Sequence, residues 1–133
     1  MREILFRGKG DTRYNDGAWY FGVPIQDADG DWQICTRLSK RVVLPETIGE
    51  FIGIHDKNEK PIFDGDIVRA KLFYRGEPER LCIVKYNPYD ATFMLMNDNR
   101  QYYKTNSTHW IEVLGNIWDN PELLRQENEY ENL

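Results

Sequence analysis

The chain has 133 residues, of which 41% are hydrophobic and 14% aromatic, and it carries a formal net charge of −5 with a sequence pI of about 5.1. This length and apolar content suffice for one domain with a real core that needs no disulfide, so they exclude a largely disordered chain. A protein that binds duplex nucleic acid usually has a basic face and a high pI, so a dominant electrostatic footprint of that kind is excluded too.

The first third of the chain predicts a meander of short strands. The strands are expected at residues 4–7, 19–23, 32–36 and 42–44. Turn sequences rich in Asp, Asn and Gly separate the first three of them. Pro24 has no backbone N–H, so it either ends the second strand or limits that strand to a sheet edge. The segment Pro45–Gly49 predicts a short helical turn that opens on proline and closes at glycine.

The run Gly53–Val68 organises the middle of the chain. It holds two turn signals, Asp56-Lys57-Asn58 and Asp64-Gly65-Asp66, between short apolar segments. Such a pattern predicts a strand, a tight reversal and then a second strand that enters a β-core.

More short strands at hairpin spacing are predicted along the rest of the chain. They are expected at residues 51–54, 61–63, 66–74, 80–86, 91–96, 101–103 and 109–118, the last bent at Gly115. Because no helix is predicted between them, the pattern favours an antiparallel barrel or sandwich over a βαβ arrangement. A short helix is predicted after them, with Asn120 as its N-cap and Pro121 at its first position.

Five blocks of the chain together resemble one protein family. They are Arg2–Arg7, Asp16–Gly22, Pro45–Gly49, Gly53–Val68 and Glu112–Leu124. The block Gly53–Val68 resembles the signature G-x-x-D-x-N-G-x-x-I-[FY]-E-G-D-I-V of the YopX family of phage and prophage proteins. The resemblance spans nearly the whole chain. It implies a phage or prophage origin and a C-terminal part resembling SH3-like barrels, and it implies no known activity.

Two residues depart from the family pattern. The family usually has glycine after the asparagine of the first turn, whereas Glu59 follows Asn58 here. A two-residue turn with both central residues at positive φ is therefore not expected, which leaves Asn58 as the residue able to adopt the left-handed conformation. Asp64 stands where glutamate is usual, and its side chain is shorter by one methylene.

The pattern as a whole predicts a mainly β protein in three parts. Residues 1–50 are expected to form an N-terminal β-rich strand meander, residues 51–118 an SH3-like β-barrel, and residues 119–133 a short C-terminal helix. The last part is acidic, with five acidic residues and one basic residue.

The polar and glycine residues of the family blocks are interpreted as structural. They are Gly53, Asp56, Asn58, Gly65, Asp66, Gly115 and Asn116. Asp64 and Asp66 are in principle close enough to bind a cation or to act as an acid and a base. However, adjacent strand side chains point to opposite faces, and a short carboxylate at a strand entry commonly accepts hydrogen bonds from turn amides.

No catalytic, cofactor-binding or metal-binding residue is predicted. The two histidines, His55 and His109, and the two cysteines, Cys35 and Cys82, lie far apart and lack the spacing of a metal site. Reduced thiols and the lack of a signal peptide or of an apolar run of about 18 residues favour a cytoplasmic protein without membrane contact. We therefore expect a non-enzymatic protein.

Two kinds of binding are considered. Eighteen aromatic residues exceed what one small core hides, so an exposed surplus predicts a protein interface, either with an unknown protein partner or by self-association into an oligomer. The alternative is nucleic acid, because basic side chains interleaved with aromatics stack bases and neutralise phosphates. The candidate contacts lie on one predicted hairpin and are Arg69, Lys71, Arg75, Arg80 and Lys85.

Overall fold

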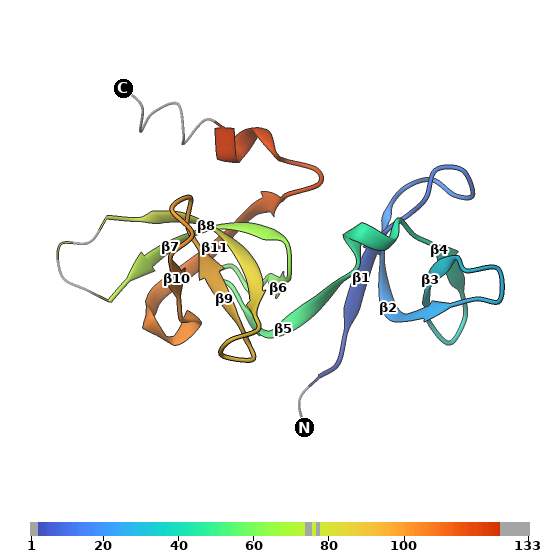
Figure 1. The fold of residues 1–133 in the computed structure, drawn as a ribbon, viewed down its shortest axis with the longest axis horizontal. Helices are drawn as coiled ribbons and strands as arrows, with labels where there is room; N and C mark the ends of the chain where they lie inside the picture. The colour runs from blue at the N-terminus through green and yellow to red at the C-terminus, as the bar shows by residue number, and fades with distance from the viewer. Residues whose placement is uncertain (1–2, 74–75, 77, 126–133) are drawn as a thin grey trace. The chain divides into compact units, whose positions relative to one another are not determined.

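The computed structural model describes residues 3–73, 76 and 78–125 (Figure 1). The chain divides into two compact units, Met1–Gly53 and Ile54–Leu133, which we call unit 1 and unit 2. The described residues form eleven strands in antiparallel sheets, with a short helix beginning at residue 122. The predicted mainly β class is therefore confirmed.

Unit 1 contains four short strands and the first part of a fifth. They are β1 (Phe6–Lys9), β2 (Trp19–Gln26), β3 (Trp32–Cys35), β4 (Lys40–Val42) and β5 (Gly49–His55), with a 3-10 turn at Pro45–Thr47. Their order in the sheet is β4-β3-β2-β1-β5. Each predicted strand of this region is present, and the predicted helical turn after Pro45 is a 3-10 turn.

The pairings of β1 to β4 form a closed cycle. Val43, just after β4, makes an antiparallel bridge with Gly10, just after β1, and the Leu44 N–H donates to the Lys9 carbonyl at 2.9 Å. Ile34 and Val43 are fully buried inside this cycle. A Cβ on Gly8 would lie 3.0 Å from a Val43 methyl carbon, so the glycine permits the close approach of β1 to this small core.

Pro24 lies inside β2, at a point where the strand is paired on one side only. Its cross-strand neighbour on β3 is Ile34, and β1 pairs with β2 only as far as Gly22. The Asp27 N–H donates to the Asp31 carbonyl, so these two residues form a hydrogen-bonded pair. Hydrogen-bonded and non-hydrogen-bonded pairs alternate along an antiparallel ladder, so the odd-numbered residues of β2 bond to β3 and the even-numbered ones do not. The nitrogen of Pro24 therefore faces the open edge, where no donor is required.

Unit 2 contains the end of β5 and six further strands. These are β6 (Pro61–Phe63), β7 (Asp66–Leu72), β8 (Arg80–Asn87), β9 (Thr92–Met96), β10 (Tyr102–Tyr103) and β11 (Thr108–Asn116), with a 3-10 turn at Thr105–Ser107. β6 pairs with β5, and the other five form a sheet in the order β10-β9-β8-β7-β11. The core consists of Ile62, Phe63, Ile67, Val68, Ala70, Leu72, Cys82, Val84, Met94, Leu95 and Ile111.

The five-stranded sheet has β10 and β11 at its edges. The pairing pattern of the described residues thus gives an open strand order for this sheet, and closure into an SH3-like barrel stays a prediction. The predicted end of the acidic helix, residues 126–133, lies outside the described residues.

Three hairpin turns share one local design. In each, the side chain of Asp27, Asp56 or Asn97 accepts hydrogen bonds from the N–H groups two and four residues later, at 2.8–3.0 Å. The residue three positions after each of these side chains has a positive φ, and only in the first turn is it glycine. The side-chain hydrogen bonds of the Asx turn thus stabilise a left-handed backbone conformation that most residues avoid.

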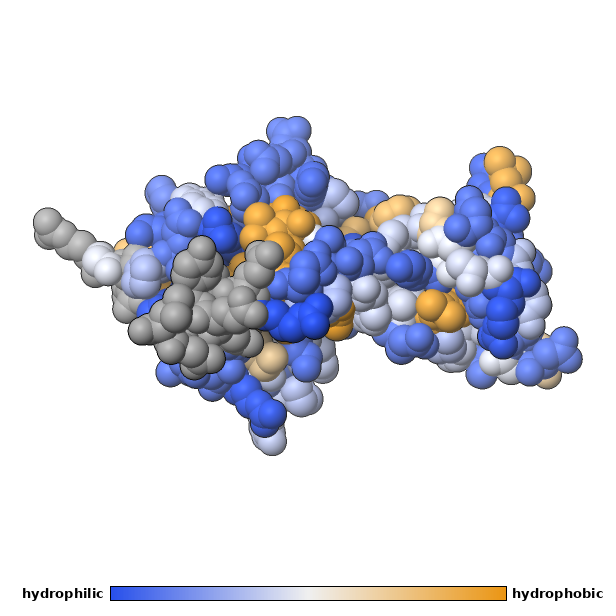
Figure 2. Space-filling model, turned by 90° about the horizontal axis from the view of Figure 1, so that it is seen from above, coloured by the Kyte–Doolittle hydropathy of each residue, from blue (hydrophilic) through white to orange (hydrophobic). Residues whose placement is uncertain are grey.

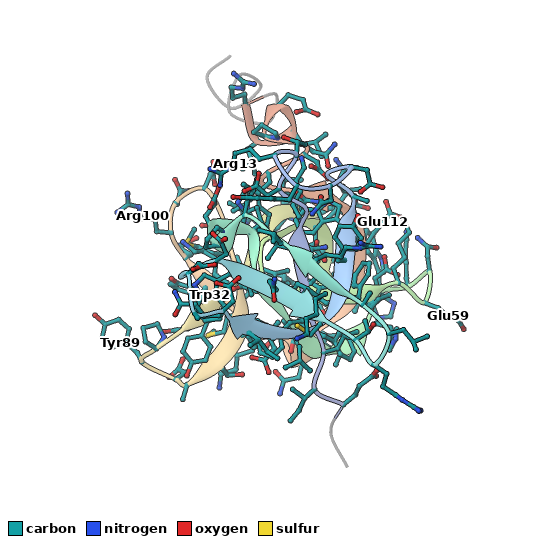
Figure 3. All side chains as sticks on the ribbon, turned by 90° about the vertical axis from the view of Figure 1, so that its right-hand side faces the viewer. Arg13, Trp32, Glu59, Tyr89, Arg100 and Glu112 are labelled. Atoms are coloured by element: carbon teal, nitrogen blue, oxygen red, sulfur yellow. The ribbon has the colours of Figure 1, made fainter. Side chains whose placement is uncertain are left out.

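The left-handed residue of the family turn is Glu59, with φ of 65°. The prediction that Asn58 takes this conformation is wrong, because the Asn58 N–H is held by the Asp56 carboxylate at 2.8 Å. The chain therefore reverses one residue later, where the Glu59 N–H donates to the Asp56 carbonyl at 3.0 Å. Figure 3 shows Glu59, like Arg100 at the equivalent position of the Asn97 turn, extending outward from the chain.

Candidate functional site

Asp56 is a buried carboxylate that joins a turn to a distant strand. Its Oδ1 accepts the N–H groups of Asn58 and Lys60, and its Oδ2 accepts the N–H of Val113 in β11 at 2.9 Å. Only 7% of the residue is exposed. Burial opposes ionisation, but the hydrogen bonds from Val113, Lys60 and Asn58 outweigh it and lower the pKa of Asp56. Both carboxylate oxygens of Asp56 thus bind backbone N–H groups.

The second turn of the signature is organised around Gly65. This residue has φ of 91°, and a Cβ at this position would overlap with the Cη2 and Cζ3 atoms of Trp118. The backbone of Gly65 also donates to Val84 and accepts from Ile117. Asp66, only 2% exposed, accepts the Phe63 N–H at 2.8 Å. Asp66 thus binds a turn amide, as its sequence position suggested.

Asn116 closes the other end of this arrangement. Its Oδ1 accepts the N–H groups of Trp118 and Asp119, and its own N–H donates to Oδ1 of Asn120 at 3.2 Å. The Asn120 N–H donates in return to the Asn116 carbonyl at 2.9 Å. A Cβ on Gly115 would overlap with the Asn120 side chain. The bonds within residues 115–120 therefore position Trp118 against Gly65.

The printed hydrogen bonds of Asp56, Asp66 and Asn116 thus connect turns and strands of unit 2. Within residues 3–73, 76 and 78–125, no group of three His, Cys, Asp or Glu side chains is close enough to hold a metal ion. The ring of His109 contacts the ring of Phe73 edge-on, with centroids 5.7 Å apart. Cys82 is buried in unit 2, and burial raises the pKa of its thiol to about 12, so it stays protonated at neutral pH.

The basic residues of the β7–β8 hairpin do not share one face. Arg69 and Lys71 alternate with buried side chains of β7 and point away from the core. Arg80 lies opposite Ala70, so its position is on the core-facing side of the sheet. Arg75 lies outside the described residues.

Two carboxylates lie near Arg69 of β7. Glu112 is the cross-strand neighbour of Arg69, and Glu79 approaches Arg69 at 3.8 Å. Lys57 forms an ion pair with Glu112 at 3.0 Å and lies 4.2 Å from the ring centroid of Trp110. The outer face around Arg69 therefore has a mixed charge.

Aromatic and basic side chains do meet on this outer face. Trp110 is the cross-strand neighbour of Lys71. Lys85 is exposed and lies on the same side of the sheet as Ile83, because side chains two residues apart on a strand share a side. Ile83 is the cross-strand neighbour of Met96 in β9, which in turn is the neighbour of Tyr102 in β10. The structure thus brings Arg69, Lys71 and Lys85 to one face and separates them from Arg80.

A different surface is formed by the outward side chains of β2. Phe21, Val23 and Ile25 are 48%, 54% and 47% exposed, and Trp19 continues the same row. We call these four residues the β2 apolar face. The view of Figure 2 shows hydrophobic residues in separate patches among hydrophilic ones. Four alternate apolar residues along one strand are therefore a distinct feature of unit 1.

Sequence reasoning missed the β2 apolar face because the strand was predicted at residues 19–23, although Pro24 was expected either to end this strand or to limit it to a sheet edge, and the second alternative is the one observed. The strand runs to Gln26, since Pro24 faces an open edge. The alternation Trp19, Phe21, Val23, Ile25 was the available signal. The general expectation of an exposed aromatic surplus is supported: Tyr14, Phe21, Phe73, Tyr86, Tyr89 and Tyr102 are all exposed.

Comparisons with known proteins give a family and a fold. The family described as YopX protein matches residues 9–125. The chain is similar to a solved structure described as protein EF1440 from Enterococcus faecalis, with a TM-score of 0.57, 19% identity, and coverage of 93% of this chain and 99% of that one. No curated protein matches the chain. No helix within the described residues is long and apolar enough to cross a membrane.

Proposed function

The chain belongs to the YopX protein family, and from this premise we propose that it is a non-catalytic accessory protein of a phage or prophage. It works in the cytoplasm of the host cell, through contacts with another protein. The observation that carries this proposal is the β2 apolar face, whose three central side chains are each about half exposed. Contiguous exposed apolar side chains are a feature of protein interaction sites.

The composition of the β2 apolar face supports a protein partner. It contains one tryptophan and one phenylalanine next to two β-branched residues. Aromatic residues are enriched at the buried centres of protein interfaces, where they supply large contact area. β-Branched side chains lose little rotamer freedom on binding because they are already stiff at χ1. The face is therefore built to bind with a low entropic cost.

Site-specific photo-cross-linking in the host cell tests this proposal. A benzophenone amino acid at position 23 is expected to give one discrete protein adduct, and the additional change Ile25→Asp is expected to remove it. The matched control places the same amino acid at position 26, because Gln26 is exposed on the opposite face of the same strand. Adducts of equal yield from both positions, or none from position 23, would contradict the proposal.

Nucleic acid is the second candidate partner, favoured by the outer face of the five-stranded sheet. Arg69, Lys71 and Lys85 lie there together with Trp110 and Tyr102, which is the combination used to bind single strands. The carboxylates of Glu79 and Glu112 near Arg69 reduce the net charge of this face.

Salt dependence distinguishes this candidate. If the face binds a labelled oligothymidine, the double change Arg69→Ala and Lys71→Ala should reduce the slope of log K against log salt by about 1.4, or about 0.7 per phosphate contact. Arg80→Ala, with its fold checked by circular dichroism, should leave the slope unchanged, because Arg80 lies on the other side of the sheet. Undetectable binding at low salt would remove nucleic acid as a candidate.

A further inference from the structure

We propose that the turn between β3 and β4 binds the surface of a membrane that contains anionic lipids. Leu38 enters the boundary between headgroups and acyl chains, and basic side chains beside it contact the headgroups. We call residues 36–41 the hairpin tip. Three features of the hairpin tip carry this inference, which goes beyond the proposed function and does not use the β2 apolar face: the exposure of Leu38, the charges around it and the hydrogen bonds of the turn.

Leu38 is the most exposed large hydrophobic residue in the described part of the chain, at 96%. It lies at a central position of the turn, whose ends are joined by a bond from the Thr36 N–H to the Ser39 carbonyl at 2.8 Å. No neighbouring side chain covers a residue that is exposed to this extent. A convex apolar side chain of this kind does not enclose a small ligand, but it can enter the boundary of an apolar layer, where burial of leucine is favourable.

The charges close to Leu38 are positive. Arg37 precedes it and Lys40 follows the turn, and both are exposed. Within the described residues, neither of these two side chains forms an ion pair. Residues 32–45 contain no carboxylate. Each Lys or Arg near an anionic membrane surface strengthens binding about fivefold.

Arg41 adds less to this charge, because a carboxylate lies near it. Its guanidinium carbon is 5.7 Å from the ring centroid of Tyr20, whose hydroxyl donates to Asp16. The pKa of Asp16 is lowered mainly by the Tyr20 hydrogen bond and to a smaller extent by Arg41. Arg37 and Lys40 are therefore the two cations on which the inference depends.

The acidic turn of unit 1 is remote from the hairpin tip. Asp27 and Asp31 belong to the turn between β2 and β3, at the other end of β3. Asp31 lies about 17 Å from Thr36 along the extended chain. The Debye length is ~8 Å at physiological salt, so these carboxylates are largely screened from Arg37 and Lys40.

The backbone of the turn suits a medium of low polarity. Thr36 Oγ1 accepts the N–H groups of Leu38 and Ser39 at 3.2 and 3.1 Å, and it lies 3.0 Å from the Ser39 hydroxyl oxygen. An unpaired N–H group costs free energy when it leaves water, and these two are already paired. The turn at Asp27 uses a carboxylate for the same purpose, whereas the Thr36 hydroxyl brings no negative charge toward lipid phosphates.

These features favour lipid over nucleic acid. Residues 33–45 contain no aromatic side chain that could stack on a base. Leucine adds nothing to a contact with phosphate, but it contributes its whole side chain at an acyl-chain boundary. The anionic cytoplasmic leaflet supplies both apolar and negatively charged groups. The expectation of no membrane contact came from the lack of a long apolar run, and a single leucine at a turn gives no such signal.

Vesicle cosedimentation with the full chain tests the inference. Phosphatidylcholine vesicles with about one third phosphatidylglycerol are compared with vesicles of phosphatidylcholine alone. The anionic vesicles are expected to bind at least about tenfold more tightly, because two cations contribute about fivefold each. One leucine buries less than a lipid anchor, so the binding constant should lie below the ~10⁴ M⁻¹ of a myristoyl chain, and titrations extend to about 10 mM lipid.

A change at Leu38 tests the inserted side chain. Leu38→Asp is expected to weaken binding to the anionic vesicles at least about tenfold. The matched control is Tyr89→Asp, the same replacement at a residue of unit 2 that is 95% exposed, and it should leave binding unchanged. Circular dichroism checks that both variants keep the fold.

Charge reversal tests the two cations. The double change Arg37→Glu and Lys40→Glu should abolish the preference for anionic vesicles. Arg100→Glu with Lys104→Glu, an equal change of charge at exposed positions of unit 2, should retain that preference.

Four outcomes would overturn the inference. They are no binding to anionic vesicles at about 10 mM lipid, equal binding to neutral vesicles, equal losses from Leu38→Asp and Tyr89→Asp, and equal losses from the two charge reversals. A labelled DNA duplex is titrated in parallel. Binding of the duplex without binding of vesicles, lost on charge reversal at Arg37 and Lys40, would assign the hairpin tip to nucleic acid instead. The cross-link at position 23 tests the proposed function separately from all of these results.

Discussion

Replacing Asp56 with alanine is expected to lower the free energy of unfolding of unit 2 by about 3 kcal/mol. The buried carboxylate accepts three backbone N–H groups, from Asn58, Lys60 and Val113. Hydrogen bonds to a charged group contribute more than neutral ones, and a buried donor left without its acceptor costs roughly 1–3 kcal/mol. Urea unfolding followed by resolved NMR signals of unit 2 measures the effect.

Two further variants separate the turn from the long-range bond. Asp56→Asn keeps one acceptor oxygen for the turn, as Asn97 does in the β9–β10 turn, but presents an NH2 group to Val113, so about half of the loss is expected. Asp27→Ala is the matched control, because its carboxylate serves only its own turn; a loss of about 1 kcal/mol in unit 1 is expected. Equal losses for Asp27→Ala and Asp56→Ala would contradict a special role for the Val113 bond.

The same carboxylate makes stability depend on pH in acid. The pKa of Asp56 is lowered from its ordinary value of 3.8 in the folded state, so the unfolded state binds the proton more readily. The stabilisation is complete above pH 3.8 and is lost as the pH falls through the lower folded pKa. Asp56→Asn should therefore show a shallower decline of stability in this range than the unchanged protein.

Replacing Gly65 with alanine is expected to destabilise unit 2 by about 3 kcal/mol or more. Glycine tolerates φ of 91°, whereas a non-glycine residue pays roughly 1–2 kcal/mol for a left-handed backbone. The added Cβ also overlaps with the Trp118 ring, and overpacking of this kind typically costs a further 1–3 kcal/mol. The urea midpoint of unit 2 measures the sum.

Gly76→Ala provides the matched control for this change. Gly76 has φ of 81°, and nothing lies within 4 Å of the position of its Cβ. Gly76→Ala should lower the free energy of unfolding by about 1–2 kcal/mol, from the left-handed backbone alone and without a steric overlap. In a Trp118→Leu background, Gly65→Ala should cost less than in the unchanged protein, because the overlapping ring atoms are gone. An undiminished cost in that background would assign the whole effect to the backbone.

The sequence by itself determined where the strands and turns of this protein lie. Aspartate and asparagine at turn entries, such as Asp27 and Asp56, bond their own backbone two and four residues on, and this signal is local. Period-two apolar runs fixed strands such as β6 and β8 to within a residue or two. The same locality explains why Glu59 was misjudged: Gly or Asn is the usual left-handed residue, and here the Asx turn imposes that conformation on glutamate.

Only the tertiary structure decided what these elements face. Asp56 meets Val113 across 57 residues, and Trp118 reaches Gly65, because the antiparallel register of β7 and β11 brings distant segments together. Register also placed Arg80 on the core side of the hairpin, away from Arg69, since cross-strand neighbours share a face. The β2 apolar face emerged only when pairing showed an open edge at Pro24. Local residue chemistry sets strand positions, whereas pairing between remote segments sets which side chains are buried and which are exposed.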